Sequence, residues 1–465
     1  MDVSQGWDLV ILGSGPGGEA AAMQAAKGGL RVAMVESSAH VGGSCAHLGT
    51  IPSKSLRHQV RQVVRAGRNP LFRELLGAHK VRWEQLVTRA AKVVEQQVYV
   101  REGFYQRNRV TVLHGIGRLD GPNHVVVEQA GEPRHRLETR NVLIATGSRP
   151  YHPDDVDFSN PRIYDSDTVL QMQHTPRHIV IYGAGVIGCE YASIFSGLGI
   201  RVDLVNSREH LLDFLDTEIT DALSYHLREQ GVTIRHSEHY RAVEADDDGV
   251  SLFLDSGKTI RADALLWSNG RAGNTEDIGL ETTGLSSDSR GHLSVNERYA
   301  TAVDGIYAVG DVIGWPSLAS AAYDQGRFFS ATLCGDEPRQ VTDVPTGIYT
   351  IPGISSVGAN EQQLTEQRVP YEVGQAFFRN LARAQITGEQ VGMLKILFHR
   401  NTREVLGIHC FGYQATEIVH VGQAIMRQPA PNNTIDYFVH TTFNYPTMAE
   451  AYRVAAINGM NRIRR

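Results

Sequence analysis

Two glycine-rich turns carry the first chemistry that the sequence indicates. Their glycines share the spacing G-x-G-x-x-G and are Gly13, Gly15 and Gly18 in the first turn and Gly183, Gly185 and Gly188 in the second. In this spacing the first glycine makes a tight turn, the second lets the backbone approach a pyrophosphate, and the third lets helix and strand pack closely. The helix N-terminus that follows faces the anion. The sequence therefore predicts two dinucleotide sites. A turn needed only for packing would not explain two copies with matching flanks.

The elements that position these glycines repeat at a constant offset of 170 residues. DLVILGSGPGGEAAAMQAAKGGLRVAMVE begins at Asp8, and HIVIYGAGVIGCEYASIFSGLGIRVDLVN begins at His178. Each copy has a short apolar run, the glycine turn, a stretch rich in small residues and a second apolar run. This order predicts a strand, a helix and a strand in each copy, which is the βαβ unit in which the glycine motif binds a dinucleotide.

The two copies end on different residues, and the difference predicts different nucleotides. The first copy ends on Glu36, 23 residues after Gly13, and an acid at this place accepts a hydrogen bond from a free ribose 2′-OH. The second ends on Asn206, and Arg208 follows it. An arginine there can bind a 2′-phosphate, while Asn206 can still bond a 2′-OH. The second site is therefore expected to accept both NAD and NADP, unless Arg208 is simply a solvated surface arginine.

Length and composition set the class of protein. The 465 residues suffice for two to four domains, and 42 % hydrophobic with 21 % charged residues is ordinary for a globular chain. The net charge of −6 and the absence of a strongly basic half argue against nucleic acid as a partner. The first apolar run is short and has no basic region before it, so neither a signal peptide nor a membrane span is expected. Four scattered cysteines fit a reducing cytoplasm and give no zinc spacing.

Two further segments resemble the FAD-binding signature of flavoproteins that bind two dinucleotides. They are NVLIATGSRP, from Asn141 to Pro150, and TAVDGIYAVGDV, from Thr301 to Val312. The resemblance implies that the first glycine turn holds FAD and that Asp311 bonds its ribityl chain. An aspartate that ends a strand can also serve only as a turn residue.

The order of these segments, with a different C-terminal part, resembles the flavin disulfide reductases over nearly the whole chain. The fold implied is α/β, with two Rossmann-like dinucleotide-binding domains, one for FAD and one for NAD(P), and a C-terminal α+β interface domain for dimerisation. The boundaries expected are 1–150 and 276–345 for the FAD domain, 151–275 for the NAD(P) domain and 346–465 for the interface domain. A homodimer or higher homo-oligomer follows from the resemblance.

The redox stretch of that family departs from its usual form here. GGSCAHLGTIPSK, from Gly42 to Lys54, keeps the first cysteine as Cys45, but Thr50 stands where the second is expected. A threonine forms neither a disulfide nor a thiolate. The resemblance places Gly42, Gly43, Ser44 and Cys45 beside the flavin, with Cys45 as a small packing residue. It also places Lys54 near the flavin ring, with Glu190 as its ion-pair partner; Glu190 could instead be an ordinary acid of the first helical turn.

A second departure lies near the C-terminus. The family usually carries H-P-T-x-x-E, whose histidine handles thiol protons, and Tyr445 replaces that histidine here. A phenol with a pKa of about 10 is a poor base at neutral pH. The dithiol and its proton-handling partner are thus missing together, while both dinucleotide turns remain. This combination resembles the Si-specific transhydrogenases of the family, which pass hydride between NADPH and NAD⁺ through FAD in a ping-pong reaction.

Other functions stay open from the sequence. The flavin could pass electrons to a quinone or to oxygen, as a diaphorase or oxidase does. A differently placed cysteine could restore a disulfide reductase resembling dihydrolipoamide dehydrogenase. The chain could also serve as a structural flavin-binding subunit, although the retained Lys54, Glu36 and Asp311 argue against this.

Overall fold

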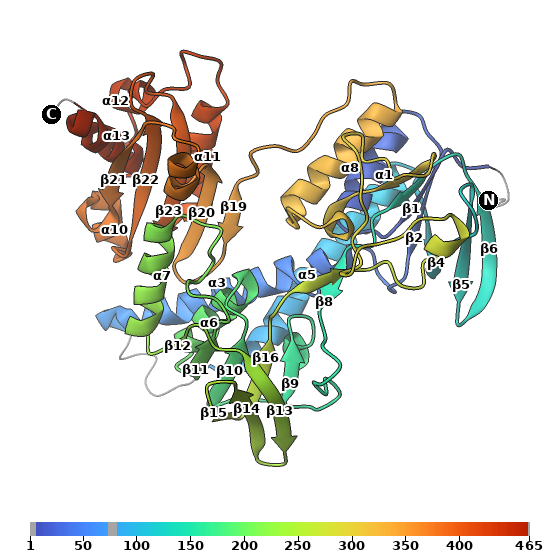
Figure 1. Cartoon of the computed structure of the whole chain (residues 1–465), viewed down its shortest axis with the longest axis horizontal. Coiled ribbons are helices and arrows are strands. Elements are labelled where there is room, and N and C mark those ends of the chain that lie inside the picture. Colours follow the sequence, from blue (N-terminus) through green and yellow to red (C-terminus); the bar gives the residue numbers. More distant parts are fainter. Residues whose placement is uncertain (1–5, 73–80, 464–465) are drawn as a thin grey trace.

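Three lobes, each built on one five-stranded sheet, make up the molecule (Figure 1). The structure is a computed structural model that describes residues 6–72 and 81–463. In Figure 1 the first lobe lies on the right and contains the N-terminus, the second lies at the bottom in green, and the third lies at the upper left in orange and red. The two glycine turns belong to different lobes, the first and the second.

The first lobe contains a parallel sheet in the order β18-β7-β1-β2-β3. Its strands are β1 (Leu9–Leu12), β2 (Val32–Glu36), β3 (Thr111–His114), β7 (Val142–Ile144) and β18 (Ile306–Ala308). The two central strands, β1 and β7, are buried along their whole length, as expected for a parallel sheet covered on both faces. The last strand comes from far along the chain, so the lobe is made of two separate segments.

The second lobe repeats this topology. Its parallel sheet has the order β12-β11-β10-β16-β9, with β10 (His178–Tyr182), β11 (Arg201–Val205), β12 (Thr233–Arg235), β16 (Ala264–Trp267) and β9 (Ile163–Asp165). In both lobes the strand before the glycine turn is central, and the strand after the first helix pairs beside it. The βαβ units predicted from the repeat are therefore present in both copies.

Smaller elements complete these two lobes in matching places. Each has an antiparallel three-stranded sheet, β4 (Ile116–Leu119), β5 (His124–Gln129) and β6 (Glu132–Glu138) in the first and β13 (Tyr240–Asp246), β14 (Gly249–Leu254) and β15 (Thr259–Ala262) in the second. Strands β8 (Ser148–Pro150) and β17 (Arg271–Gly273) pair where the chain leaves the first lobe and returns to it. The helices are α1 (Pro16–Lys27), α2 (Gly43–His47), α3 (Thr50–Arg68), α5 (Trp83–Arg107), α6 (Val186–Gly197), α7 (Thr217–Glu229) and α8 (Ala319–Leu333). Short 3-10 turns lie at η1 (Val169–Gln171), η2 (Leu280–Thr282) and η3 (Gly310–Ile313).

The third lobe is an antiparallel sheet with helices packed on it. The strand order is β19-β20-β23-β22-β21, with β19 (Thr346–Ile348), β20 (Gly353–Gly358), β21 (Tyr371–Phe377), β22 (Gly392–His399) and β23 (Val405–Gly412). The helical elements are α9 (Glu361–Glu366), η4 (Phe378–Asn380), α10 (Ala382–Thr387), α11 (Ala415–Met426), α12 (Asp436–His440) and α13 (Glu450–Ile463). This is the mixed α and β composition expected of the C-terminal part.

Helices α3 and α5 connect the lobes through a shared apolar core. Trp83 at the start of α5 is fully buried, and its ring lies 4.8 Å from that of Phe195 in α6. The same core includes Ile348 and Phe411 of the third lobe. Residues of α3 and α5 thus leave water together with residues of the second and third lobes, which holds these parts against one another.

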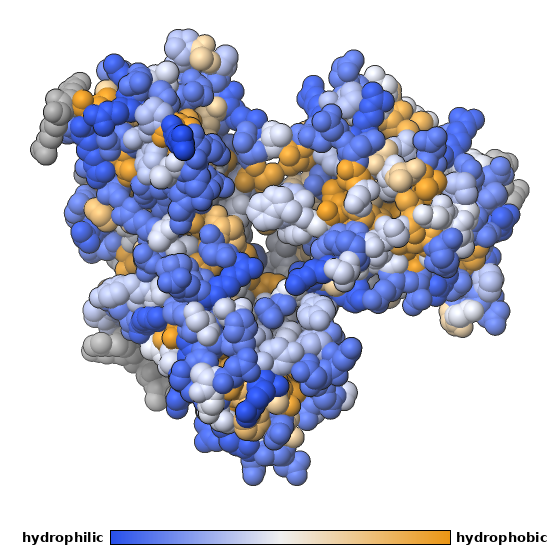
Figure 2. Space-filling view, in the orientation of Figure 1, coloured by the Kyte–Doolittle hydropathy of each residue, from blue (hydrophilic) through white to orange (hydrophobic). Residues whose placement is uncertain are grey.

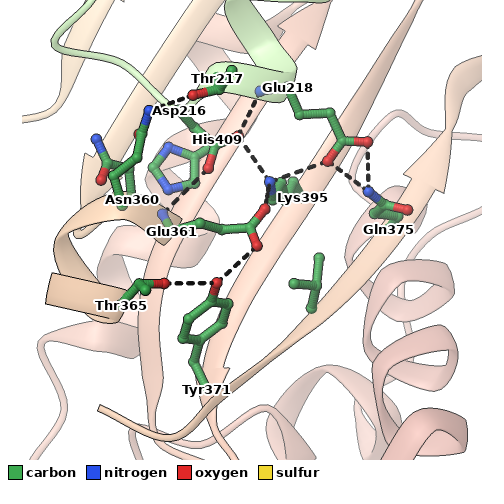
Figure 3. Close-up of polar contacts among 12 residues, drawn as sticks. Asp216, Thr217, Glu218, Asn360, Glu361, Thr365, Tyr371, Gln375, Lys395 and His409 are labelled. Atoms are coloured by element: carbon green, nitrogen blue, oxygen red, sulfur yellow. Dashed lines mark hydrogen bonds and ion pairs between the residues drawn. The ribbon is translucent and has the colours of Figure 1, made fainter. Parts of the chain in front are cut away.

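A buried ion cluster also joins the second lobe to the third (Figure 3). Lys395 of β22 has no exposed side-chain surface, and its Nζ lies 2.8 Å from Asp216 and 3.1 Å from Glu218, with Glu361 in contact as well. Burial alone would lower the pKa of Lys395, but hydrogen bonds to Asp216 and Glu361 raise it above the ordinary value. The ammonium therefore stays charged between three carboxylates and holds the start of α7 against the third lobe.

Within residues 6–72 and 81–463, no helix combines the length and the apolar character needed to cross a membrane.

Candidate active site

The two glycine turns have the same backbone geometry. Gly13 and Gly183 have φ angles of +101° and +105°, in the region that side chains rarely adopt. A Cβ on Gly18 would lie 1.9 Å from the carbonyl oxygen of Gly13, and one on Gly188 would lie 1.9 Å from that of Gly183. In both copies the first glycine therefore makes the turn, and the third lets the helix pack against it.

The middle glycines face open space. Apart from the adjoining residues and the backbone of the same helix, no atom in the described part of the chain lies within 4 Å of a Cβ built on Gly15 or on Gly185. Helices α1 and α6 begin directly after them, at Pro16 and Val186, so the first backbone N–H groups of each helix face the same space. A diphosphate fits both places, because the backbone is approachable and the helix end is electropositive.

A cavity of ≈ 860 Å³ extends from the first turn to the meeting point of the three lobes. Figure 2 shows the surface hollowed between the lobes, and hydrophobic residues are visible on the first lobe where it faces the third. The sequence-predicted residues that line the cavity are Gly13, Gly15, Glu36, Gly43, Ser44, Cys45, Lys54, Glu190 and Asp311. Gly18 and Gly42 lie outside its lining, and Gly42 instead donates its N–H to the Ser14 hydroxyl.

Glu36 ends β2 as a buried carboxylate beside the first turn. Its side chain is 4 % exposed, and Oε2 accepts a hydrogen bond of 3.0 Å from the Ser14 N–H. Oε1 accepts a bond of 2.8 Å from the Ser38 N–H, at the cavity wall. These bonds hold the carboxylate at the carboxyl end of the strand, where an acid reads a nucleotide ribose.

Asp311 also lines the cavity. Its Oδ2 accepts a hydrogen bond of 2.8 Å from Ser148, whose hydroxyl in turn accepts one of 2.8 Å from the Arg271 Nε. Ser148 lies on β8, Arg271 on β17 and Asp311 in η3, so the three residues come from separate parts of the chain. The chain of bonds orients the Asp311 carboxylate, so a ligand hydroxyl can be held there.

Lys54 and Glu190 form an ion pair inside the cavity, although 136 residues separate them. The Lys54 Nζ lies 2.8 Å from Glu190 Oε2, and the two side chains are 28 % and 5 % exposed. The backbone N–H of Tyr349 donates a 2.8 Å hydrogen bond to Glu190 Oε1. Glu190 lies beyond the first turn of α6, so the alternative of an ordinary first-turn acid does not describe it.

Cys45 lies in the cavity wall as a thiol beside Thr50. All four cysteines fall in the described part of the chain, and none of them forms a disulfide. Burial raises the pKa of the Cys45 thiol, and the hydrogen bond from the Thr50 side chain offsets this only in part. The thiol is therefore held in its protonated, weakly nucleophilic form.

Asn206 and Arg208 lie at the end of β11, outside this cavity. Asn206 is 4 % exposed, and its Nδ2 donates hydrogen bonds of 2.9 Å to the carbonyl oxygens of Arg208 and His210. Its Oδ1 accepts a hydrogen bond of 3.3 Å from the Arg208 N–H, so both ends of the amide shape the loop. Arg208 is 67 % exposed and pairs with Asp213.

The cavity contains residues that sequence reasoning missed. Tyr349, Thr416 and His420 reach it from the third lobe. Glu19 and Arg101 do not line the cavity, but they form a buried ion pair of 2.9 Å, and both influence the pKa of Cys45. Their spacing gave no signal, because each depends on how helices distant in sequence pack. Ser148, which also was not predicted as a site residue, lies in the segment NVLIATGSRP that resembles part of the FAD-binding signature.

Comparisons with known proteins identify the family and agree with the fold. Residues 7–326 match the pyridine nucleotide-disulphide oxidoreductase family, and residues 344–456 match the dimerisation domain of that family. The chain belongs to this family. The third lobe is therefore the dimerisation domain of this family. The fold class expected from the sequence is confirmed.

Similar proteins fall into two groups. A protein from Marinomonas sp. named "Soluble pyridine nucleotide transhydrogenase" is 59 % identical over 458 residues, which cover 98 % of this chain and 99 % of that one. A protein of the same name from Pseudomonas fluorescens is 60 % identical with the same coverage. Among solved structures, the HOCl-induced flavoprotein disulfide reductase RclA from Escherichia coli has a TM-score of 0.87 at 25 % identity, covering 97 % of this chain and 99 % of its own. LpdA from Mycobacterium tuberculosis gives the same values. This pyridine nucleotide-disulphide oxidoreductase thus has the fold of a flavoprotein disulfide reductase, whereas the relatives that are 59 % and 60 % identical to it are named transhydrogenases.

Proposed function

We propose that the chain is a flavin-dependent transhydrogenase that passes hydride between NADPH and NAD⁺. The observation that carries this proposal is Thr50, which stands beside Cys45 where a disulfide reductase needs a second thiol. Both dinucleotide turns and the Lys54–Glu190 pair are nevertheless intact. The curated relatives from Marinomonas and Pseudomonas, similar over almost the whole chain, are transhydrogenases by name.

FAD is the cofactor of this family, and the first lobe fits it. When bound, FAD supplies a ring that accepts a hydride from one nicotinamide and gives it to another. We assign the diphosphate to the first turn, a ribose hydroxyl to Glu36 and the ribityl chain to Asp311. Gly42 and Gly43 support the turn, since a Cβ on Gly43 would lie 2.8 Å from the Gly15 Cα. Ser44 and Cys45 pack beside the ring.

Lys54 acts through its charge. Glu190 and the Tyr349 N–H hold the ammonium in the cavity, so no reorganisation is needed when negative charge arrives with the hydride. The raised pKa of the Cys45 thiol keeps sulfur out of the reaction. The chain thus favours hydride exchange and excludes transfer to a disulfide.

NAD and NADP take the second turn as substrates, one after the other. Gly183, Gly185 and Gly188 receive the diphosphate of either nucleotide, and Asn206 with Arg208 meets the adenosine ribose. A single site serves both, so the reaction is ping-pong. Its direction follows the concentration ratios of the two nucleotide pairs.

Three further predictions accompany this proposal. The domain boundaries are 1–150 with 276–345, 151–275 and 346–465. The protein forms a homodimer through the third lobe, which matches the family's dimerisation domain. It works in the cytoplasm, where its four cysteines remain thiols. Light scattering on the eluting holoprotein tests the dimer, which corresponds to about twice the 51.2 kDa chain mass.

Turnover with NADPH and thio-NAD⁺, measured in both directions on purified holoprotein, tests the function. We expect hydride exchange without added quinone or disulfide. An anaerobic titration with NADPH separates the alternatives, because FAD alone takes up about two electrons per chain and a working dithiol takes up about two more. Uptake of four electrons, or a chain that reduces a dye but never thio-NAD⁺, would exclude the proposal.

A further inference from the structure

An ion pair at the edge of the second lobe lies in the loop between β11 and α7. The Nη1 of Arg208 lies 2.5 Å from Oδ1 of Asp213, and the two side chains are 67 % and 44 % exposed. The loop begins at Asn206, directly after the strand that ends the second repeat. The residue expected to meet a 2′-phosphate therefore already has an anionic partner from its own loop.

The loop is anchored at both ends. At its start, the buried Asn206 side chain donates to the carbonyl oxygens of Arg208 and His210. At its end, Asp216 is 1 % exposed and accepts a hydrogen bond from Lys395 of the third lobe, as Figure 3 shows. Phe214, next to Asp213, also meets Trp315 of the first lobe, with ring centroids 6.4 Å apart. The loop is therefore held near the position in which Arg208 and Asp213 meet.

A fixed carboxylate beside Arg208 changes how the site distinguishes the nucleotides. A 2′-phosphate must displace Asp213 from the guanidinium and then lie close to its negative charge. A free 2′-OH carries no charge, so it neither has to displace Asp213 nor is repelled by it. The preference for NADP that Arg208 alone would create is therefore reduced.

We propose that Asp213 is a specificity-determining residue that balances NADP against NAD at this site. The inference rests on the proposed function, because both nucleotides must bind and leave the same place in each turnover. An arginine without a counter-charge would retain NADP and slow its exchange for NAD. With Asp213, the two nucleotides bind with more similar affinity.

The experiment compares nucleotide binding in the FAD-loaded protein and in its variants. Calorimetry measures Kd for NADP⁺ and for NAD⁺ in wild type, Asp213→Asn, Arg208→Ala and the double variant. We expect Asp213→Asn to tighten NADP⁺ by about 5- to 30-fold and to leave NAD⁺ within about twofold. In the Arg208→Ala background the same change should tighten NADP⁺ by less than about threefold, because the partner of the carboxylate is gone.

Controls separate this inference from folding and from the proposed function. Asp324→Asn removes the acid of a comparable exposed pair on α8, 2.7 Å from Arg327, and should leave both Kd values unchanged. Flavin content and the melting temperature check that each variant is folded. If Asp213→Asn does not fold, Asp213→Ser takes its place. If Arg208→Ala weakens NADP⁺ but Asp213→Asn changes nothing or changes both nucleotides equally, the role of Asp213 is wrong. If wild type binds both nucleotides but transfers no hydride between them, the proposed function fails instead, whatever Asp213 does.

Discussion

The first and second lobes contain the same turn but treat their ligands differently. Gly13 and Gly183 have nearly equal φ angles, and the helix behind each turn packs against it at the same distance. The residues that read the ribose differ. Glu36 is buried and held by backbone N–H groups, whereas Arg208 is exposed and paired within its own loop. On the function proposed above, the glycines specify that a dinucleotide binds, and the residues at the strand end specify which dinucleotide binds and whether it is released.

This difference suits a cofactor that stays and substrates that exchange. A buried carboxylate beside a deep cavity suits a ligand that is not released between turnovers. An exposed guanidinium with a competing carboxylate suits ligands that must leave. Four changes test the comparison, and they are ordered from the largest expected effect to the smallest.

The largest effect is expected from the third glycine of each turn. Gly18→Ala places a Cβ 1.9 Å from the Gly13 carbonyl oxygen, so the helix must move away from the turn. We expect FAD content to fall at least about tenfold, since about 1.4 kcal/mol already gives that factor. Gly188→Ala should keep FAD and lose reduction by NADPH. Flavin absorbance measures FAD content, and stopped-flow spectroscopy measures reduction by NADPH. Gly67→Ala in α3 is the control, because a Cβ built on Gly67 meets no described neighbouring atom within 4 Å. Equal flavin loss in Gly18→Ala and Gly188→Ala would contradict the division of roles.

The next effect concerns the charge in the cavity. Lys54→Met removes the ammonium beside Glu190 and leaves that carboxylate 5 % exposed without its partner. We expect kcat for NADPH to thio-NAD⁺ to fall about 10²- to 10³-fold with FAD still bound. Lys92→Met, at an exposed position of α5, should leave kcat unchanged. A rise in KM alone, with kcat preserved, would show that Lys54 serves binding and not hydride transfer.

A smaller and selective effect is expected at the second strand end. Arg208→Ala should lower kcat/KM for NADPH by about 10- to 150-fold, because a charge-assisted hydrogen bond to the 2′-phosphate is lost. Asn206→Glu should act in the same direction by placing a carboxylate there, as Glu36 does in the first lobe. NADH use should persist in both variants. Rates with a dye acceptor measure this, and equal losses for NADH and NADPH would refute dual recognition at these positions.

The smallest effect is expected at Cys45. Cys45→Ser should keep transhydrogenation within about threefold of wild type, because burial raises the pKa of the thiol and Thr50 offers no second sulfur. Initial rates at saturating nucleotide measure it, and Cys334→Ser, at an exposed cysteine, is the matched control. A loss of about a thousandfold with FAD retained would mean that the thiol takes part in the chemistry.

The sequence predicted the parts of the fold that depend on local conformation. A glycine turn between a strand and a helix needs a positive φ angle and two close approaches, and these requirements appear directly as the spacing of Gly13, Gly15 and Gly18. The second copy repeats them at an offset of 170 residues, so both βαβ units were predictable.

Only the tertiary structure decided which distant side chains meet. Asp213 as the partner of Arg208, Lys395 as the anchor of Asp216, and Ser148 between Arg271 and Asp311 follow no spacing rule. The first contact depends on how one loop folds, and the other two join segments that are far apart in the sequence. An exposed aspartate or a lysine within an apolar strand gives no sign of its partner in the sequence. The sequence by itself thus determined that two dinucleotides bind and that the second thiol is missing. The packing of three lobes decided which charges surround them, because electrostatic interactions depend on distance in space and not on separation along the chain.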